Sequence, residues 1–186
     1  VIQEVMRQFT VLPFSFGTVA AREEEVREML TRYRDEFLAQ LQHLDAKAEF
    51  GVKVLWRDKE LPFKEILAER EDIRRYRDAI ARQPPALRQQ DLIQIGEMVQ
   101  KALEAKREAM SRRILERLQP LAEVRVNAIY MDQMLMNAAF LLDRGGELAF
   151  EGLLREMDRE FDGRLLFRLT GPSPPFNFVQ MPVTWQ

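Results

Sequence analysis

Apolar and polar residues alternate along several short stretches of this 186-residue chain, which is the pattern of a strand with one buried face. Two such stretches lie in its later part, at residues 50–57 and 124–130, and residues 134–142 and 164–170 are two further predicted strands. The stretch over residues 134–142 is apolar almost throughout, as in a strand covered on both faces. A fifth stretch, residues 10–19, is rich in β-branched and aromatic residues but contains Pro13, which favours an edge strand or a bulge.

Between these stretches, apolar residues recur every three or four positions, which predicts helices. The helices should cover residues 23–43, 62–83, 88–119 and 150–161. Pro62 suits the first turn of the second helix, and Pro84 must end it. The helix over residues 88–119 would be roughly 45–50 Å long at 1.5 Å per residue. Its apolar stripe is either a core face or, at a free end, a surface that binds a partner.

From residue 49 onward the expected order is strand, helices, strand, strand, helix and strand. This order predicts an α+β fold in which a ferredoxin-like (split βαβ) antiparallel sheet carries helices on one face. The long helix over residues 88–119 is an insertion in that pattern, and a strand over residues 176–181 is an addition at its end. We expect residues 45–186 to form this domain and residues 1–44 to be the remnant of a first α+β domain, with a strand and a helix.

The inner faces of these strands and helices should pack into one hydrophobic core. Its predicted members come from all parts of the domain: Phe50, Val54, Trp56, Val126, Ala138, Phe140, Leu154, Phe161 and Phe167.

Three prolines in four residues follow the predicted strand over residues 164–170. Pro172, Pro174 and Pro175 lack backbone donors, so they are excluded from a helix interior or a central strand. The pattern predicts a stiff connector that delivers a short C-terminal strand, Phe176 to Met181, to a fixed place. Phe176 and Phe178 would then point in one direction.

The prolines lie in a segment, residues 171–179, that resembles the C-terminal signature of the gas vesicle GvpL/GvpF family. Three further stretches match that family in the right order: residues 11–19, 49–56 and 134–142. The resemblance covers essentially the whole chain. Ser15, Ser173 and Phe176 depart from the usual pattern, which commonly has arginine, a larger apolar residue and tyrosine there. Since a strand and a helix precede this region in the family, we expect residues 1–8 to end a helix and the chain to be a fragment.

Composition restricts the function classes. The net charge is -2, from 28 basic and 30 acidic residues, so the surface is not that of a nucleic-acid-binding polyelectrolyte. Cysteine is absent, which excludes disulfides, thiolate nucleophiles and cysteine metal sites. No apolar run approaches 18 residues, so we expect no membrane span.

Candidate chemical groups are sparse, and we predict no catalytic, cofactor-binding or metal-binding residue. His43 is the only histidine and lies at a predicted helix end, where its positive form suits the helix dipole. Acidic clusters at residues 23–25, 69–72 and 156–160 should face solvent. Gly145 and Gly146 belong to no phosphate-binding motif.

Two other features invite a functional interpretation. Ferredoxin-like sheets include RNA-binding modules that stack bases on strand aromatics, and Phe50, Trp56 and Phe167 lie in predicted strands. We expect these three to fill the core instead, and we expect no nucleic-acid partner. Arg112 and Arg113 should form a solvated patch.

The resemblance implies an accessory and minor structural protein of gas vesicle assembly, which is cytoplasmic and vesicle-associated. Its expected partners are the apolar shell protein and other gas vesicle accessory proteins. Binding the shell protein would help nucleation or prevent aggregation, without nucleotide hydrolysis and without enzymatic activity. Two alternatives remain open at this point: an enzyme on a ferredoxin-like fold, or an interaction module unrelated to gas vesicles. A cleft with convergent polar groups and displaced carboxylate pKa values would favour the enzyme.

Overall fold

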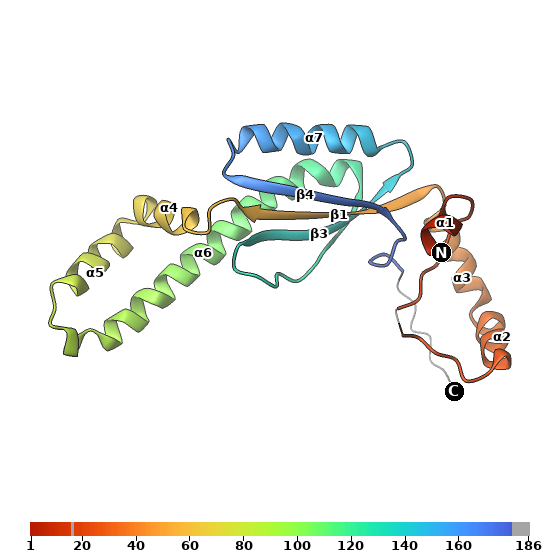
Figure 1. The fold of residues 1–186 in the computed structure, drawn as a ribbon, viewed down its shortest axis with the longest axis horizontal. Coiled ribbons are helices and arrows are strands. Elements are labelled where there is room, and N and C mark those ends of the chain that lie inside the picture. Colours follow the sequence, from red (N-terminus) through yellow and green to blue (C-terminus); the bar gives the residue numbers. More distant parts are fainter. Residues whose placement is uncertain (16, 180–186) are drawn as a thin grey trace.

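A four-stranded antiparallel sheet lies at the centre of the computed structural model, which describes residues 1–15 and 17–179 (Figure 1). Its strands are β1 (Lys47–Trp56), β2 (Glu123–Val126), β3 (Met134–Asp143) and β4 (Leu165–Ser173). They lie in the order β2-β3-β1-β4, and all neighbours are antiparallel. The predicted mixture of helices with an antiparallel sheet is therefore confirmed.

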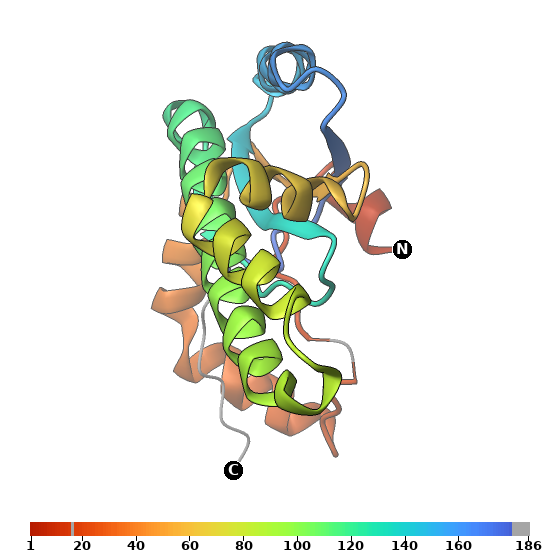
Figure 2. The same ribbon diagram turned by 90° about the vertical axis from the view of Figure 1, so that its left-hand side faces the viewer.

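Seven α-helices accompany the sheet in the described residues. They are α1 (Ile2–Met6), α2 (Glu23–Arg32), α3 (Arg34–His43), α4 (Leu61–Glu69), α5 (Glu71–Ala81), α6 (Gln89–Leu118) and α7 (Glu147–Glu160). The 30-residue α6 confirms the predicted long helix, and it extends well beyond the end of the sheet. There it packs against α4 and α5, and these two helices with residues 89–107 of α6 form a helical arm (Figures 1 and 2).

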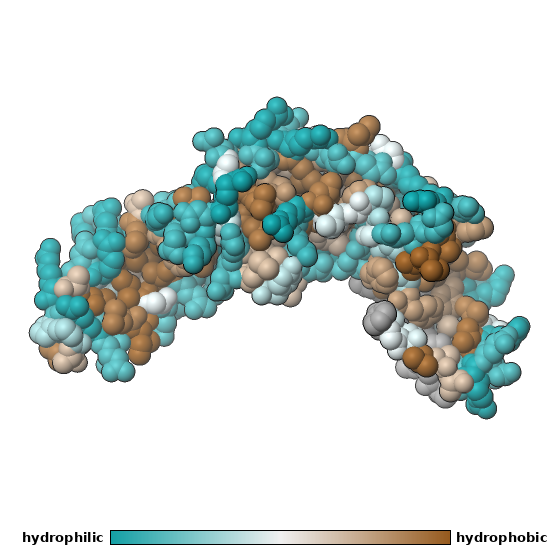
Figure 3. Space-filling view, in the orientation of Figure 1, coloured by the Kyte–Doolittle hydropathy of each residue, from teal (hydrophilic) through white to brown (hydrophobic). Residues whose placement is uncertain are grey.

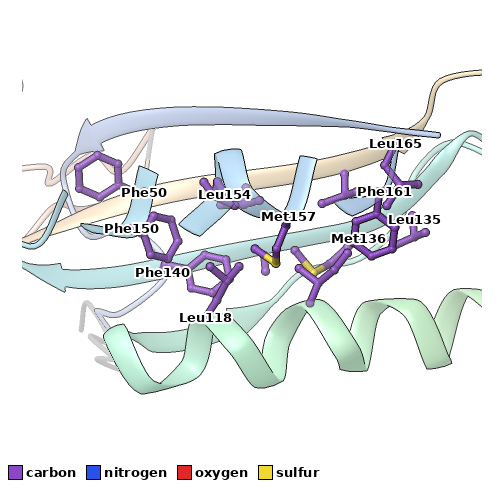
Figure 4. Packing of buried hydrophobic residues seen from close by; sticks show 14 of the residues in the cluster. Phe50, Leu118, Leu135, Met136, Phe140, Phe150, Leu154, Met157, Phe161 and Leu165 are labelled. Carbon is purple, nitrogen blue, oxygen red and sulfur yellow. The ribbon is translucent and has the colours of Figure 1, made fainter. Parts of the chain in front are cut away.

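The main core lies between one face of the sheet and helices α6 and α7 (Figure 4). Alternate residues of β1 and β3 point into it because side chains in a strand alternate between faces. The rings of Phe140 on β3 and Phe150 on α7 lie 5.1 Å apart, centroid to centroid. Ile114 and Leu118, from the last turns of α6, complete this core.

The predicted core is confirmed except at one position. Phe167 is partly buried, and seven more of the predicted residues are buried: Phe50, Val54, Trp56, Ala138, Phe140, Leu154 and Phe161. The prediction is wrong at Val126, which is 66% exposed. Val126 is the last residue of the short edge strand β2. The alternating sequence pattern continues to this residue, although the packing of the core ends before it.

A smaller cluster covers the opposite face of β3. Ala139 and Leu141 pack there against Leu44, at the end of α3, and Phe178 from the C-terminal segment. Because β3 is thus buried on both faces, its almost continuous apolar sequence is explained.

The arm has a hydrophobic core of its own. Ile66 of α4, Ile73 of α5 and Ala102 of α6 are its buried members. Lys106 of α6 adds ion pairs to two residues of α4, with Nζ 3.0 Å from Glu65 Oε2 and 2.6 Å from Glu69 Oε1. The apolar stripe of α6 therefore serves the sheet at one end and the arm in its middle.

Two predicted helices are interrupted in the structure. The segment over residues 23–43 breaks at Tyr33, whose φ of -105° and ψ of 23° are not helical. The segment over residues 62–83 breaks at Arg70, which has an extended backbone. The Arg70 guanidinium donates hydrogen bonds to Asp72, and this contact lowers the pKa of Asp72 to about 2. Apolar residues recur at helical intervals across both breaks, so the hydrophobic pattern alone does not show where the helices are interrupted.

Two strand predictions, over residues 10–19 and over residues 176–181, are wrong in the part of the chain that the structure describes. The described part of residues 10–19 forms no strand, because it has no neighbouring strand to pair with and strand propensity alone does not stabilise an isolated one. Residues 176–179 form a helical turn, in which the N–H groups of Phe178 and Val179 both donate to the Pro175 carbonyl. Residues 180 and 181 lie outside the described part of the chain.

The proline connector is also shorter than predicted. Strand β4 continues through Gly171 and Pro172 to Ser173. It tolerates a proline because it lies at the edge of the sheet, where a missing N–H need not break the pairing. No helix in the described residues is both long enough and apolar enough to cross a membrane.

Candidate protein-interaction site

The C-terminal segment, residues 171–179, is held against the sheet by a buried carboxylate. Glu49 of β1 is 6% exposed, and its Oε2 accepts the backbone N–H of Asn177 at 2.8 Å. Its Oε1 accepts the side-chain amide of Asn177 at 2.6 Å. Burial raises the pKa of Glu49, while these two hydrogen bonds act in the opposite direction. The carboxylate faces the protein's own donors, so it serves to position the segment.

Glycine makes the close approach of this segment possible. Gly171 has a φ of +128°, a conformation that other residues rarely adopt. A Cβ at this position would lie 2.8 Å from the Glu49 carbonyl oxygen and 2.9 Å from a ring carbon of Phe50. The family signature at residues 171–179 is therefore architectural: its glycine lets β4 lie on β1, and its asparagine binds Glu49.

His43 takes part in a surface ion pair. It ends α3, as expected, and its Nε2 lies 3.0 Å from Glu123 Oε2 on β2. Both side chains are partly exposed. Throughout the described residues, no three histidine or acidic side chains are grouped as metal ligands would be.

The acidic clusters remain apart from one another, and several of their members pair with basic residues. Glu23 at the start of α2 pairs with Arg27, and Glu160 of α7 pairs with Arg117 at 2.6 Å. Arg112 is a solvated partner of Glu108, as predicted for the pair at residues 112 and 113. Its neighbour has a second role, because the Arg113 guanidinium lies 5.5 Å from the centre of the Phe161 ring.

The other singled-out residues are structural. Gly145, with a φ of +98°, makes the turn from β3 to α7. Its N–H donates to Glu147 Oε2 at 2.7 Å. Phe50 and Trp56 are buried, so their faces are not available for stacking on bases.

The free end of the arm presents large apolar side chains to solvent. Leu87, Leu92 and Ile93 are 69%, 55% and 59% exposed. Figure 3 shows apolar surface along the arm, between hydrophilic stretches. The arm is held in shape nearby by Asp91, which accepts hydrogen bonds from the Tyr76 hydroxyl and the Gln83 amide. These bonds lower the pKa of Asp91. Exposed apolar residues that gather in a patch mark many interaction surfaces, so this end of the arm is a candidate.

A cleft of about 440 Å³ lies at the base of the arm. Phe63 of α4 and Val99 and Leu103 of α6 line it with apolar surface. Its charged lining residues are Lys59, Glu60, Glu104, Arg107 and Asp132. A lining of apolar side chains bordered by charged groups is also found where two polypeptides meet.

Sequence reasoning missed Glu49, although it stands in one of the stretches that carry the family resemblance. The available signal was a carboxylate in a predicted strand, with the apolar residues Ala48 and Phe50 on either side of it. The sequence also leaves open whether the apolar stripe of α6 is a core face or a partner surface. In the structure, parts of that stripe pack against the sheet, parts lie in the arm core and parts are exposed to solvent.

Comparison with known proteins identifies the family. The model of the gas vesicle synthesis protein GvpL/GvpF family matches residues 1–180. The chain belongs to the GvpL/GvpF family. Gas vesicle protein F of Nostoc sp. strain PCC 7120 is 28% identical over 174 residues, which are 92% of this chain and 70% of that protein. The corresponding protein of Dolichospermum flosaquae is 27% identical over 173 residues, covering 92% of this chain and 69% of the relative.

Solved structures of GvpF share this fold. The crystal structure of GvpF from Anabaena sp. PCC7120 matches with a TM-score of 0.86 and 27% identity, over 96% of this chain and 74% of that one. GvpF from Microcystis aeruginosa matches in fold with a TM-score of 0.79, over 97% of this chain and 74% of that one. The family expected from four sequence stretches is thus confirmed across nearly the whole chain.

Proposed function

We propose that this protein is an accessory, minor structural component of gas vesicle assembly that binds the apolar shell protein. The observation that carries the proposal is the match to the GvpL/GvpF family over residues 1–180. Its action would be cytoplasmic and vesicle-associated, and other gas vesicle accessory proteins are further expected partners.

A physical need supports a binder of this kind. A shell that excludes liquid water requires a strongly apolar inner face, so a shell monomer exposes an aggregation-prone surface before assembly. The apolar residues at the end of the arm, Leu87, Leu92 and Ile93, offer a surface of matching character. Contact between two apolar surfaces is favourable by about 25 cal/mol for each Å² removed from water.

The proposed role is non-enzymatic and independent of nucleotide. The chain contains neither the P-loop pattern nor the dinucleotide-binding glycine pattern. The rival enzyme hypothesis would place its chemistry in a cleft, and the cleft at the base of the arm has both apolar and charged lining residues, such as Val99 and Glu104. The family match favours the binding role instead. The second alternative, an interaction module unrelated to gas vesicles, is disfavoured by the family match.

We also infer that the sheet is a variant of the ferredoxin-like, split βαβ arrangement. The strand order β2-β3-β1-β4 supports this, as do the helical connection from β1 to β2 and the position of α7 between β3 and β4. The arm would then be an insertion in the first connection, available for partners because the sheet does not need it.

Aggregation of purified shell protein, followed by light scattering after dilution from denaturant, tests the proposal. The wild-type chain should slow the rise in scattering at near-equal molar ratio. A variant with glutamate at 87, 92 and 93 should do so less, while Arg112→Gln, which removes an exposed charge elsewhere on α6, should behave as wild type. Equal scattering with and without the wild-type chain would refute shell-protein binding.

A further inference from the structure

A groove of about 400 Å³ runs between α7 and the free edge of β4. Leu154 of α7 and Phe167 and Leu169 of β4 line it with apolar surface. Figure 1 shows α7 lying along β4, and Figure 3 shows apolar surface between the hydrophilic outer side of α7 and the sheet. The groove thus combines an apolar floor with the backbone of an edge strand.

The main chain of this edge is available for pairing. Strand β4 is last in the sheet order, so within residues 1–15 and 17–179 only β1 pairs with it. The Arg57 N–H donates to the Arg164 carbonyl at 3.0 Å, which places Arg164 in a hydrogen-bonded pair. Because such pairs alternate along antiparallel strands, Arg168 also faces β1, while the N–H and C=O groups of Phe167 and Leu169 point away from the sheet.

We propose that this groove binds an extended segment of the gas vesicle shell protein, which adds to the sheet as a fifth strand beside β4. The inference rests on the proposed function for the identity of the partner. Main-chain hydrogen bonds to Phe167 and Leu169 would hold the segment. Its alternate side chains would lie on the apolar floor, against Leu154.

An extended segment fits better than a helix. A helix satisfies its own backbone groups, so it would leave the donors and acceptors of Phe167 and Leu169 unpaired. The rim carries two cations, Arg57 and Arg155, and two anions, Glu151 and Asp158. This balance favours an uncharged occupant, which matches the apolar character that a water-excluding shell requires of its subunits.

The other edge of the sheet is a poorer candidate. Strand β2 has four residues, and by the same alternation only Val124 and Val126 direct main-chain groups outward. Strand β4 is longer, and α7 stands beside it as a second wall.

Binding of shell protein fused to a solubilising carrier tests the groove. Leu169→Glu places a charge on the apolar floor and should weaken binding at least tenfold. Arg168→Glu, on the same strand but with its exposed side chain on the opposite face, should bind as wild type. Equal binding by all three proteins would overturn the groove and leave the proposed function intact. If the wild type does not bind, the proposed function fails as well.

Residue-specific amide exchange gives a second readout that needs no variant. Addition of the carrier-fused shell protein should protect the amides of Phe167 and Leu169, whereas Arg168 should be protected already, since its N–H faces β1. Unchanged exchange at both positions, or new protection at Val124 and Val126 instead, would overturn the proposal. Protection that depends on the concentration of this chain alone would identify a second copy as the occupant and would also overturn it.

Discussion

Asn177 binds the buried carboxylate of Glu49 through both its backbone N–H and its side-chain amide, at 2.8 and 2.6 Å. The two residues are 128 positions apart in sequence. Ser173 adds a hydrogen bond from its hydroxyl to the Glu49 carbonyl oxygen at 3.1 Å. The C-terminal segment is therefore fixed to the central strand β1, and Phe178 is brought onto the opposite face of the sheet from α7.

Loss of the Asn177 side chain should destabilise the protein. Asn177→Ala removes one of the two donors to a buried carboxylate, and an unsatisfied buried group costs about 1–3 kcal/mol. Denaturant melts should show this decrease in the free energy of unfolding. Phe176→Ala is the matched control, because Phe176 is half exposed and should change stability by less than about 0.5 kcal/mol. Equal effects at the two positions would contradict the role of the Glu49 contact.

The same carboxylate predicts a pH dependence. Burial raises the pKa of Glu49 above its usual 4.5, so the native state holds this proton more tightly than the unfolded state. The resulting stability is fully present below pH 4.5 and is lost as the pH rises through the native-state pKa. Glu49→Gln does not titrate and lacks this contribution.

The wild type should therefore gain stability relative to Glu49→Gln as the pH falls from 7 towards 4.5. Paired melts of the two proteins at several pH values measure the difference, and contributions from other groups largely cancel. A constant difference, or one that moves in favour of the variant at lower pH, would show that burial does not raise the pKa of Glu49.

The core between the sheet and the two helices depends on large aromatic residues. Phe140 is fully buried and its ring lies against Phe150. Phe140→Ala should lower the free energy of unfolding by about 3–5 kcal/mol, the usual cost of truncating a buried phenylalanine. A loss below about 1 kcal/mol in a two-state denaturant melt would contradict its placement in the core.

Nucleotide should be irrelevant to this protein. Isothermal titration with ATP and Mg²⁺ should give no heat of specific binding, because the chain encodes no phosphate-binding loop. A dissociation constant in the micromolar range would be incompatible with the nucleotide-independent role proposed above.

Local patterns predicted the strands and the long helix because each has a periodicity that burial imposes on it. The alternation of Phe50, Val52 and Val54 follows from one face of β1 lying on the core. Alternation gives the wrong prediction at Val126, because the alternating pattern continues to this residue although it is exposed. The strand prediction over residues 10–19 also failed, because strand propensity does not reveal whether a neighbouring strand is present.

The partner surfaces required the tertiary structure. Leu92 and Ile114 belong to the same apolar stripe of α6, yet only Ile114 is buried, because the sheet lies next to it. The sequence predicts a stiff proline connector and a strand after it, whereas the form of this segment depends on Glu49 and Gly171 meeting across two strands. No spacing within the sequence encodes that contact.

Co-purification with the shell protein tests the central claim most directly. The chain, carrying an affinity tag, should retain the untagged shell protein when the two are produced together. The glutamate variant at 87, 92 and 93 should retain less of it, with an unchanged melting temperature. Absence of shell protein from the eluate of the wild-type chain would contradict the account.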